Sequence, residues 1–330
     1  MLAARDTSPD PHKPRGLLQG VKLLVASMPR ATPKPAKQSS QSSAQPEAVN
    51  HLWLIKAVAF TILAALLCGY LTLCLLFYQG QWQLVLHPHR ATAKPQEIES
   101  SWIHFGPDES ATPQLTGRWL PAAPGARYAN TTILFLPSGD GSLSDFNSTL
   151  DRLHNIGINV FAFDYRGYGF SAATHPNQQR MSKDAESAWT YLNTSRAIPA
   201  QQIIPYGTGV GASLATHLAV LHPAVPALIL ESPKGDLLDD VIRDNRASLV
   251  PVRLLFHEHF PLAKPLESLR TSKLLITTPA STDKAFRTAS DPKLAIEFAS
   301  PSDALYTQTL TRFLDQYVVP TPAPSPAIPR

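Results

Sequence analysis

The distribution of apolar and polar residues separates one long apolar run from a downstream region in which short aliphatic segments alternate with amphipathic ones. The run from Ala57 to Tyr78 carries no charged residue. As an α-helix rising about 1.5 Å per residue, it would span roughly 33 Å, close to the thickness of the hydrocarbon core of a bilayer. Trp53 precedes the run and Trp82 follows it, where interfacial aromatic residues are expected. We predict one transmembrane helix within residues 52–79.

Downstream of this helix, six short aliphatic segments have the composition of strands that are buried on both faces of a parallel sheet. These segments are Thr132–Leu136, Val160–Phe163, Ile203–Tyr206, Ala227–Leu230, Leu274–Thr277 and Leu294–Phe298.

Amphipathic segments lie between and after the predicted strands. Apolar residues recur at helical spacing in one segment, for which Ser182 is the expected N-cap, and again near the end of the chain. The two sets are Ala185, Ala188, Trp189 and Leu192, and Leu310, Phe313, Leu314 and Tyr317. Strands that alternate with helices predict an α/β fold, with a mostly parallel sheet and helices on both faces.

Proline marks the parts of the chain outside this pattern. Seven of the 31 prolines lie in the first 50 residues, and the stretch from Val319 onward is again rich in proline, which is typical of extended, solvated tails. We therefore expect a disordered basic tail over residues 1–51, the transmembrane helix over 52–79 and a juxtamembrane linker over 80–100. A folded domain should occupy 101–318 and a second disordered tail 319–330.

Charge and cysteine content exclude several classes of function. The net charge is +4, and much of the excess of lysine and arginine lies in the N-terminal tail. Because no basic stripe with interleaved aromatic residues is present, we expect no nucleic-acid partner. By the positive-inside rule, the basic tail favours a cytoplasmic N-terminus and an exported, periplasmic or extracellular domain. Cys68 and Cys74 lie within the apolar run, which disfavours reactive thiolates. We expect neither a metal ion nor a cofactor.

The order of motifs in the predicted domain resembles that of the α/β-hydrolases. The stretches that carry the resemblance are LFLPSGDGSLSDF, LHNIGINVFAFDYRGYGFS, DAESAWTYLN, QIIPYGTGVGASLATHLAVLHP and LILESP. The sequence is similar to the membrane-anchored, serine-aminopeptidase-like branch, and the juxtamembrane FYQGQWQLVLHP agrees with this. The resemblance implies a mostly parallel sheet with helices on both faces and a small cap.

In this family the catalytic serine stands at the centre of a G-x-S-x-G turn between a strand and a helix, and the next backbone N–H contributes to the oxyanion hole. The matching residues are Gly207-Thr208-Gly209-Val210-Gly211. Gly209 therefore takes the serine position, and Val210 takes the oxyanion position. Because glycine adopts the strained turn without a Cβ penalty, the turn can survive, but the nucleophile is lost.

The other catalytic positions are also changed. The resemblance implies a histidine after the last strand, but Ser302 lies in that loop and the last histidine of the chain is His259. Pro137-Ser138, ahead of Gly139, replaces the His-Gly pair that shapes the oxyanion loop, and Asp283 falls near the position of the acid. A triad without its members retains only a residual acceleration of about 10³–10⁴ over water. The degenerate site comprises Ser138, Gly139, Gly209, Val210, Asp283 and Ser302.

Three alternatives stay open. An active ester or amide hydrolase could use Ser138, Thr208 or Ser213 as a non-standard nucleophile. The segment Gly207–Ala212 also fits the G-x-G-x-x-G/A dinucleotide fingerprint, and Glu231 ends the next strand. The pairs His87-Pro88-His89 and His257-Glu258-His259 have the alternate spacing of metal ligands. No further ligands lie near either pair in the sequence, so we expect solvated side chains.

We interpret the chain as a single-pass membrane protein with a catalytically degenerate α/β-hydrolase-like domain. It would act by binding a small molecule or a protein in the former active-site cleft. The N-terminus of the helix that follows Gly209 would suit an anion or a carbonyl group there, because its N–H groups are free.

Overall fold

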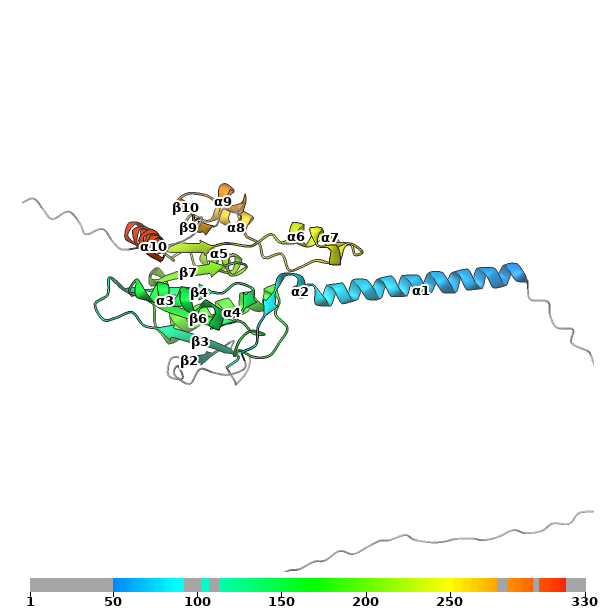
Figure 1. The fold of residues 1–330 in the computed structure, drawn as a ribbon, viewed down its shortest axis with the longest axis horizontal. Helices are drawn as coiled ribbons and strands as arrows, with labels where there is room; N and C mark the ends of the chain where they lie inside the picture. The colour runs from blue at the N-terminus through cyan, green and yellow to red at the C-terminus, as the bar shows by residue number, and fades with distance from the viewer. Residues whose placement is uncertain (1–49, 92–101, 107–112, 278–283, 299–302, 319–330) are drawn as a thin grey trace, which may run out of the picture. The chain divides into compact units, whose positions relative to one another are not determined.

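The computed structural model describes residues 50–91, 102–106, 113–277, 284–298 and 303–318. Both predicted tails, Asp283 and Ser302 lie outside the described residues. The central element is an eight-stranded sheet with the order β10-β9-β8-β7-β4-β6-β3-β2, seen in Figure 1. All neighbouring strands are parallel except β2–β3 and β3–β6. The strands are β2 (Trp102–Phe105), β3 (Leu115–Leu120), β4 (Tyr128–Leu136), β6 (Ile158–Asp164), β7 (Ile203–Thr208), β8 (Ala227–Glu231), β9 (Ser272–Thr277) and β10 (Lys293–Glu297).

All six predicted strands are present, and the α/β-hydrolase-type architecture is confirmed. Strand β7 is buried along its whole length, as expected of a parallel strand covered on both faces. Its neighbours in the sheet are β4 and β8. The connection after β7 therefore leaves from the middle of the sheet, at the carboxyl ends of the parallel strands.

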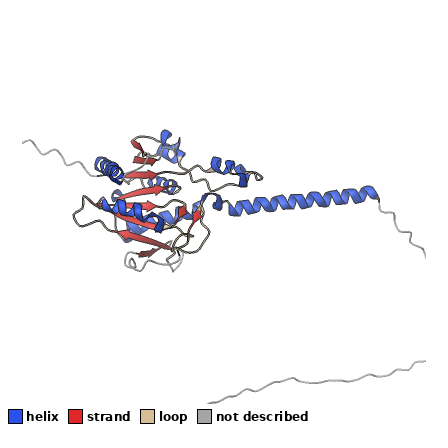
Figure 2. Ribbon diagram, in the orientation of Figure 1, coloured by secondary structure: helices blue, strands red, loops and turns tan. Residues whose placement is uncertain are grey.

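Helices cover the two faces of the sheet (Figure 2). One face packs against α3 (Asn147–Asn155) and α10 (Asp303–Tyr317), whose buried leucines and aromatic residues join one apolar cluster. The other face packs against α4 (Gln178–Thr190), α5 (Gly211–Leu221) and α8 (Ala263–Ser268). Shorter helices are η2 (Leu143–Phe146), η3 (Tyr191–Ser195), η4 (Ala200–Gln202) and α9 (Lys284–Thr288). Both predicted helices are present; they correspond to the later halves of α4 and α10.

The N-cap predicted for α4 is wrong. The helix begins at Gln178, and the side chain of Asn177 accepts a hydrogen bond from the backbone N–H of Arg180 at 2.8 Å. Ser182 therefore lies inside the helix. Asp184, also inside the helix, is fully buried and pairs with Arg166 at 2.6 Å. Asn177 accepts a hydrogen bond from a backbone N–H of the first turn that would otherwise lack a partner. Helix α4 therefore begins before the apolar residues from which it was predicted.

Helix α1 (His51–Gly80) is long and apolar enough to cross a membrane. Its composition matches the predicted transmembrane segment, and none of its residues is classed as buried.

The juxtamembrane segment, predicted as a linker over 80–100, packs on the domain between Gln81 and Ala91. It contains α2 (Trp82–Val85) and a two-residue strand, β1 (His87–Pro88). Strand β1 pairs in parallel with β5 (Asp140–Gly141), which follows β4. Gln81 and Leu86 are almost completely buried.

A small cap lies between β8 and α8. It comprises α6 (Leu238–Arg243), η5 (Asn245–Ala247) and α7 (Val252–Leu255). Figure 1 shows α6 and α7 beyond the carboxyl ends of the parallel strands, on the side of the sheet where α/β proteins place their ligands.

The ion pair between Arg166 and Asp184 provides a test of the fold. Burial raises the pKa of Asp184 to about 6, although hydrogen bonds from Arg166 oppose this shift. Because Arg166→Met would leave a buried carboxyl group without its partner, we expect it to lower the free energy of unfolding by about 3–5 kcal/mol. The control Arg243→Met breaks the exposed pair with Asp240 and should cost less than about 1 kcal/mol. Denaturant titration of the full chain in detergent measures both. Equal midpoints for the two variants would contradict this account.

Candidate active site

The turn from β7 to α5 retains the backbone of a nucleophile elbow without the nucleophile. Gly209 lies at the turn with a φ of +52°, in the left-handed region that glycine adopts without a Cβ penalty. Its N–H donates to the carbonyl of Glu231 at 3.3 Å, and its carbonyl accepts from the backbone N–H of Lys234 at 2.9 Å. The turn is therefore held by the chain that follows β8, and it presents bare backbone where the family has a hydroxyl group.

The space over Gly209 is occupied by Ser138. A Cβ atom on Gly209 would lie only 2.7 Å from the Cβ of Ser138, closer than carbon atoms normally approach. The Ser138 hydroxyl donates to the carbonyl of Asp140 at 3.2 Å and accepts from the N–H of Asp140 at 3.3 Å. Ser138 thus stabilises its own loop, and its hydroxyl group donates a hydrogen bond to a backbone carbonyl.

The oxyanion positions are covered by the juxtamembrane segment. A Cβ atom on Gly139 would lie 2.5 Å from Cδ2 of Leu86 and 2.9 Å from Cγ2 of Val210. Leu86 and Val210 are only 1% and 2% exposed. The carbonyl of Gly139 accepts hydrogen bonds from the N–H of His87 at 2.7 Å and from the Tyr168 hydroxyl at 3.0 Å. We call Leu86, Ser138, Gly139, Gly209 and Val210 the filled elbow, because side chains of Leu86, Ser138 and Val210 occupy the space beside the two glycines.

Little space is left beside the filled elbow. The hollow bordered by Ser138, Asp140 and Tyr168 has no interior room for a water molecule. Burial raises the pKa of nearby Asp164 to about 6, and its carboxylate accepts from the N–H of Leu143 at 2.7 Å. Asp164 therefore has a structural role in this loop.

One catalytic-type pair was missed by sequence reasoning. Nδ1 of His87 lies 2.6 Å from Oδ1 of Asp140, and Nζ of Lys234 lies 3.6 Å from Oδ2 of the same carboxylate. Nδ1 of His89 lies 3.8 Å from Oδ2 of Asp145. Each histidine of the first His-x-His pair therefore faces an aspartate. These contacts depend on the pairing of β1 with β5, for which the sequence gives no local signal.

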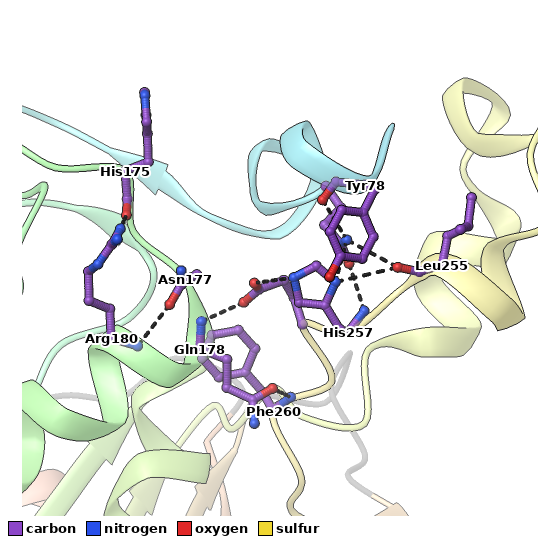
Figure 3. A network of polar contacts seen from close by, with 10 residues as sticks. Tyr78, His175, Asn177, Gln178, Arg180, Leu255, His257 and Phe260 are labelled. Atoms are coloured by element: carbon purple, nitrogen blue, oxygen red, sulfur yellow. Dashed lines mark hydrogen bonds and ion pairs between the residues drawn. The ribbon is translucent and has the colours of Figure 1, made fainter. Parts of the chain in front are cut away.

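Both histidines of the second His-x-His pair are exposed, as expected, but His257 lies beside a polar network that includes buried side chains (Figure 3). Gln81 donates to the carbonyl of Leu255 at 3.2 Å and accepts from the N–H of His257 at 2.7 Å. Glu258, between the histidines, is 2% exposed and accepts from the backbone N–H of Gln178. Burial raises the pKa of Glu258. The network joins the end of α1, the cap and the start of α4.

A cavity of about 420 Å³ lies beside α5 and is bordered by Ser213, His217, His257 and Glu258, among other residues. The Ser213 hydroxyl donates to the carbonyl of Pro261 at 2.7 Å. His217 faces Glu186 at 3.1 Å. The cavity therefore collects a hydroxyl group and two imidazoles without joining them into a nucleophile–base pair.

The glycines of the predicted nucleotide fingerprint are explained by close packing of the strand and the helix. A Cβ atom on Gly207 would lie 2.3 Å from the carbonyl oxygen of Gly211, and one on Gly211 would lie 2.2 Å from that of Leu136. Glu231, the expected ribose-binding acid, accepts a hydrogen bond from the Tyr206 hydroxyl at 2.6 Å. The sequence pattern is therefore accounted for without a dinucleotide.

Comparison with known proteins agrees with this fold. The model of the family described as "Serine aminopeptidase, S33" matches residues 129–308, more than half of the chain. The chain belongs to this family. In the S33 domain, the match begins within β4 and ends within α10, so it includes Ser138, Gly139, Gly209 and Val210 of the filled elbow but not Leu86 of the juxtamembrane segment.

Several relatives and solved structures are similar to this S33-family chain. An uncharacterised protein of Mycobacterium tuberculosis is 28% identical over 203 residues, covering 60% of this chain and 69% of the relative. The human alpha/beta hydrolase domain-containing protein 17B is 33% identical over 112 residues, covering 34% of this chain and 37% of the relative. An esterase from Pyrococcus furiosus superposes with a TM-score of 0.55 at 15% identity, covering 71% of this chain and 98% of the esterase. The likeness to the esterase concerns the fold alone.

The contact between Gly209 and Ser138 can be tested with a matched pair of glycine substitutions. Gly125 also has a positive φ, +80°, but no atom lies within 4 Å of a Cβ placed there. Gly125→Ala should cost about 1–2 kcal/mol from backbone strain alone, whereas Gly209→Ala should cost a further 1–3 kcal/mol, roughly, from overpacking against Ser138.

Denaturant titration of the single variants and of Gly209→Ala/Ser138→Gly measures this difference. The second substitution should remove most of the extra cost, since it removes the Cβ atom in the way. Equal costs for Gly125→Ala and Gly209→Ala would show that the elbow is open.

Proposed function

We propose that this protein is a membrane-anchored, non-hydrolytic member of the S33 family, whose domain works by binding a small molecule or a protein. The observation that carries the proposal is the filled elbow: Gly209 has no side chain, and Ser138 and Leu86 occupy the space over the turn and the oxyanion positions. A substrate carbonyl needs an attacking oxygen atom and donors directed at the developing oxyanion. Gly209 supplies no attacking oxygen atom, and Leu86 packs beside Gly139 in the oxyanion loop.

Helix α1 supports the membrane anchor. Its length and its apolar composition suit a bilayer, and the basic N-terminal tail favours a cytoplasmic N-terminus with the domain on the outer side. A tether of this kind keeps a binding domain at the membrane surface without any catalytic requirement.

The cavity beside α5 is the place that we propose for a small ligand. A ligand in the former cleft would have to displace Leu86, which is packed against Gly139 and Val210. The cavity of about 420 Å³ needs no such displacement, and its size lies within the range of small-molecule sites. Its polar border, with the carboxyl group of Glu258, favours a polar ligand that can donate hydrogen bonds.

A fluorophosphonate probe tests the absence of hydrolytic chemistry. Because no activated hydroxyl group stands at the elbow, the full chain in detergent should remain unlabelled under conditions in which a known serine hydrolase is labelled completely. The variant Gly209→Ser should also remain unlabelled, since the chain has no histidine after β10, where the family places the base of this serine. Covalent labelling of the unaltered chain at any serine would overturn the proposal.

The pair His87–Asp140 favours one second candidate, an active hydrolase in which Ser138 is the nucleophile. An aspartate bonded to Nδ1 of a histidine is the arrangement that orients a general base, and Ser138 lies in the same loop. In that case, fluorophosphonate labelling would occur and would be lost in both Ser138→Ala and His87→Ala. Labelling that survives both substitutions would exclude this candidate as well.

A further inference from the structure

The cap exposes two leucines more completely than any other large apolar residue described outside α1. Leu249 is 75% exposed and Leu254 is 81% exposed. They lie five residues apart, Leu249 in the turn that connects η5 to α7 and Leu254 in α7. Single exposed leucines are common on protein surfaces, but two within one short segment form a local apolar tip. We call residues 249–254 the cap tip.

The cap tip is joined to the end of α1 by hydrogen bonds. Gln81 is the residue directly after α1, and its side chain donates to the carbonyl of Leu255, the neighbour of Leu254. The same side chain lies 2.6 Å from Nδ1 of His257, whose ring centroid is 4.8 Å from that of Tyr78 in α1. Figure 3 shows Tyr78, Leu255 and His257 gathered around this point. Gln81 is buried, so the junction is a packed contact.

Because of this contact, the depth at which α1 lies in a bilayer also determines the depth of the cap tip. Tyr78 ends the uncharged run, at the level where aromatic residues meet the headgroups. The headgroup layer on each side of the hydrocarbon core is about 5–8 Å thick, and apolar side chains at an interface reach about 5–10 Å into the headgroup–acyl boundary. Leu254 is one residue from a carbonyl bonded to Gln81, so it lies within this range.

The residue beside Leu254 fits the same environment. Arg253 is exposed next to Leu254. An arginine at this level can extend its guanidinium group toward lipid phosphates while its stem lies along the apolar surface. Arg243 and Arg246, farther along the cap, pair with Asp240 and Asp244 instead. The two exposed leucines and the neighbouring arginine therefore lie in the segment directly before Leu255, whose carbonyl is bonded to Gln81.

We propose that the cap tip, through Leu249 and Leu254, inserts into the headgroup–acyl boundary of the membrane that α1 spans. The domain would then contact the lipid surface at two places, the end of α1 and the cap, which would fix its orientation on the membrane. This inference rests on the membrane anchor of the proposed function. The partner is a phospholipid interface, recognised by apolar side chains and one cation rather than by a specific headgroup.

Depth-dependent quenching on the full chain tests the proposal. Cys68 and Cys74 are replaced by alanine, and an environment-sensitive nitrobenzoxadiazole probe is attached at one new cysteine. The three sites are Leu254→Cys in the cap, Leu66→Cys in α1, and Leu221→Cys. Leu221 is a matched control because it is an exposed leucine, 48% exposed, at the far end of α5 from the elbow. The chain is reconstituted in vesicles of phosphatidylcholine and phosphatidylglycerol, with and without doxyl lipid, a mixture labelled near the headgroup and near the end of the acyl chain.

The doxyl lipid should quench the probe at Leu254 and at Leu66 but leave the probe at Leu221 unchanged. Quenching at Leu66 with none at Leu254 would overturn the inference and leave the membrane anchor intact. No quenching at Leu66 would overturn the anchor, and the inference with it.

A second variant separates insertion of the leucines from mere proximity to lipid. With the probe at Ser248→Cys, the double substitution Leu249→Ser/Leu254→Ser should abolish the quenching seen in its parent. Both leucines are exposed, so the domain should fold normally, which denaturant titration checks. Quenching that persists in the double variant would show that the leucines do not hold the cap at the lipid.

Discussion

The packing of Leu86 against Gly139 and Val210 is the contact on which the rest of the site depends. It places a side chain of the juxtamembrane segment beside Gly139, in the loop that shapes the oxyanion hole in the family. Removing a buried leucine of this kind costs about 2–5 kcal/mol, so a ligand that displaced it would have to replace a comparable stabilisation. Two interactions hold the segment on either side of Leu86: the buried Gln81 junction with the cap, and the pairing of β1 with β5.

The filled elbow shows how a catalytic turn can persist after its chemistry is gone. The left-handed conformation of Gly209 is held by hydrogen bonds with the chain around Glu231 and Lys234, none of which requires a serine side chain. Gly207 and Gly211 are needed because the helix approaches the strands closely. The core of the domain likewise consists of apolar residues on the strands and helices, which are chemically unlike the residues of a catalytic triad. The fold therefore depends little on the residues that catalysis would require.

Most of the sheet could be predicted from the sequence because its central strands are buried on both faces and are continuously apolar. Strands β2 and β3 were missed, since WIHF and LTGRWL mix polar residues and glycine with apolar ones at the antiparallel edge of the sheet. The loss of the serine was visible because the elbow motif is local in sequence. Leu86 over Gly139, and His87 beside Asp140, could not be predicted, because both contacts join residues about 50 positions apart through a strand of only two residues.

The accessibility of a thiol at position 86 tests the central claim most directly. In the full chain with Cys68 and Cys74 replaced by alanine, Leu86→Cys should react with a maleimide at least about tenfold more slowly than Gln83→Cys, because reaction at a buried site requires local opening. Gln83 is exposed in the same segment, and both sites should react equally fast after denaturation. Equal rates in the folded chain would contradict the account, because they would mean that the juxtamembrane segment leaves the oxyanion positions open.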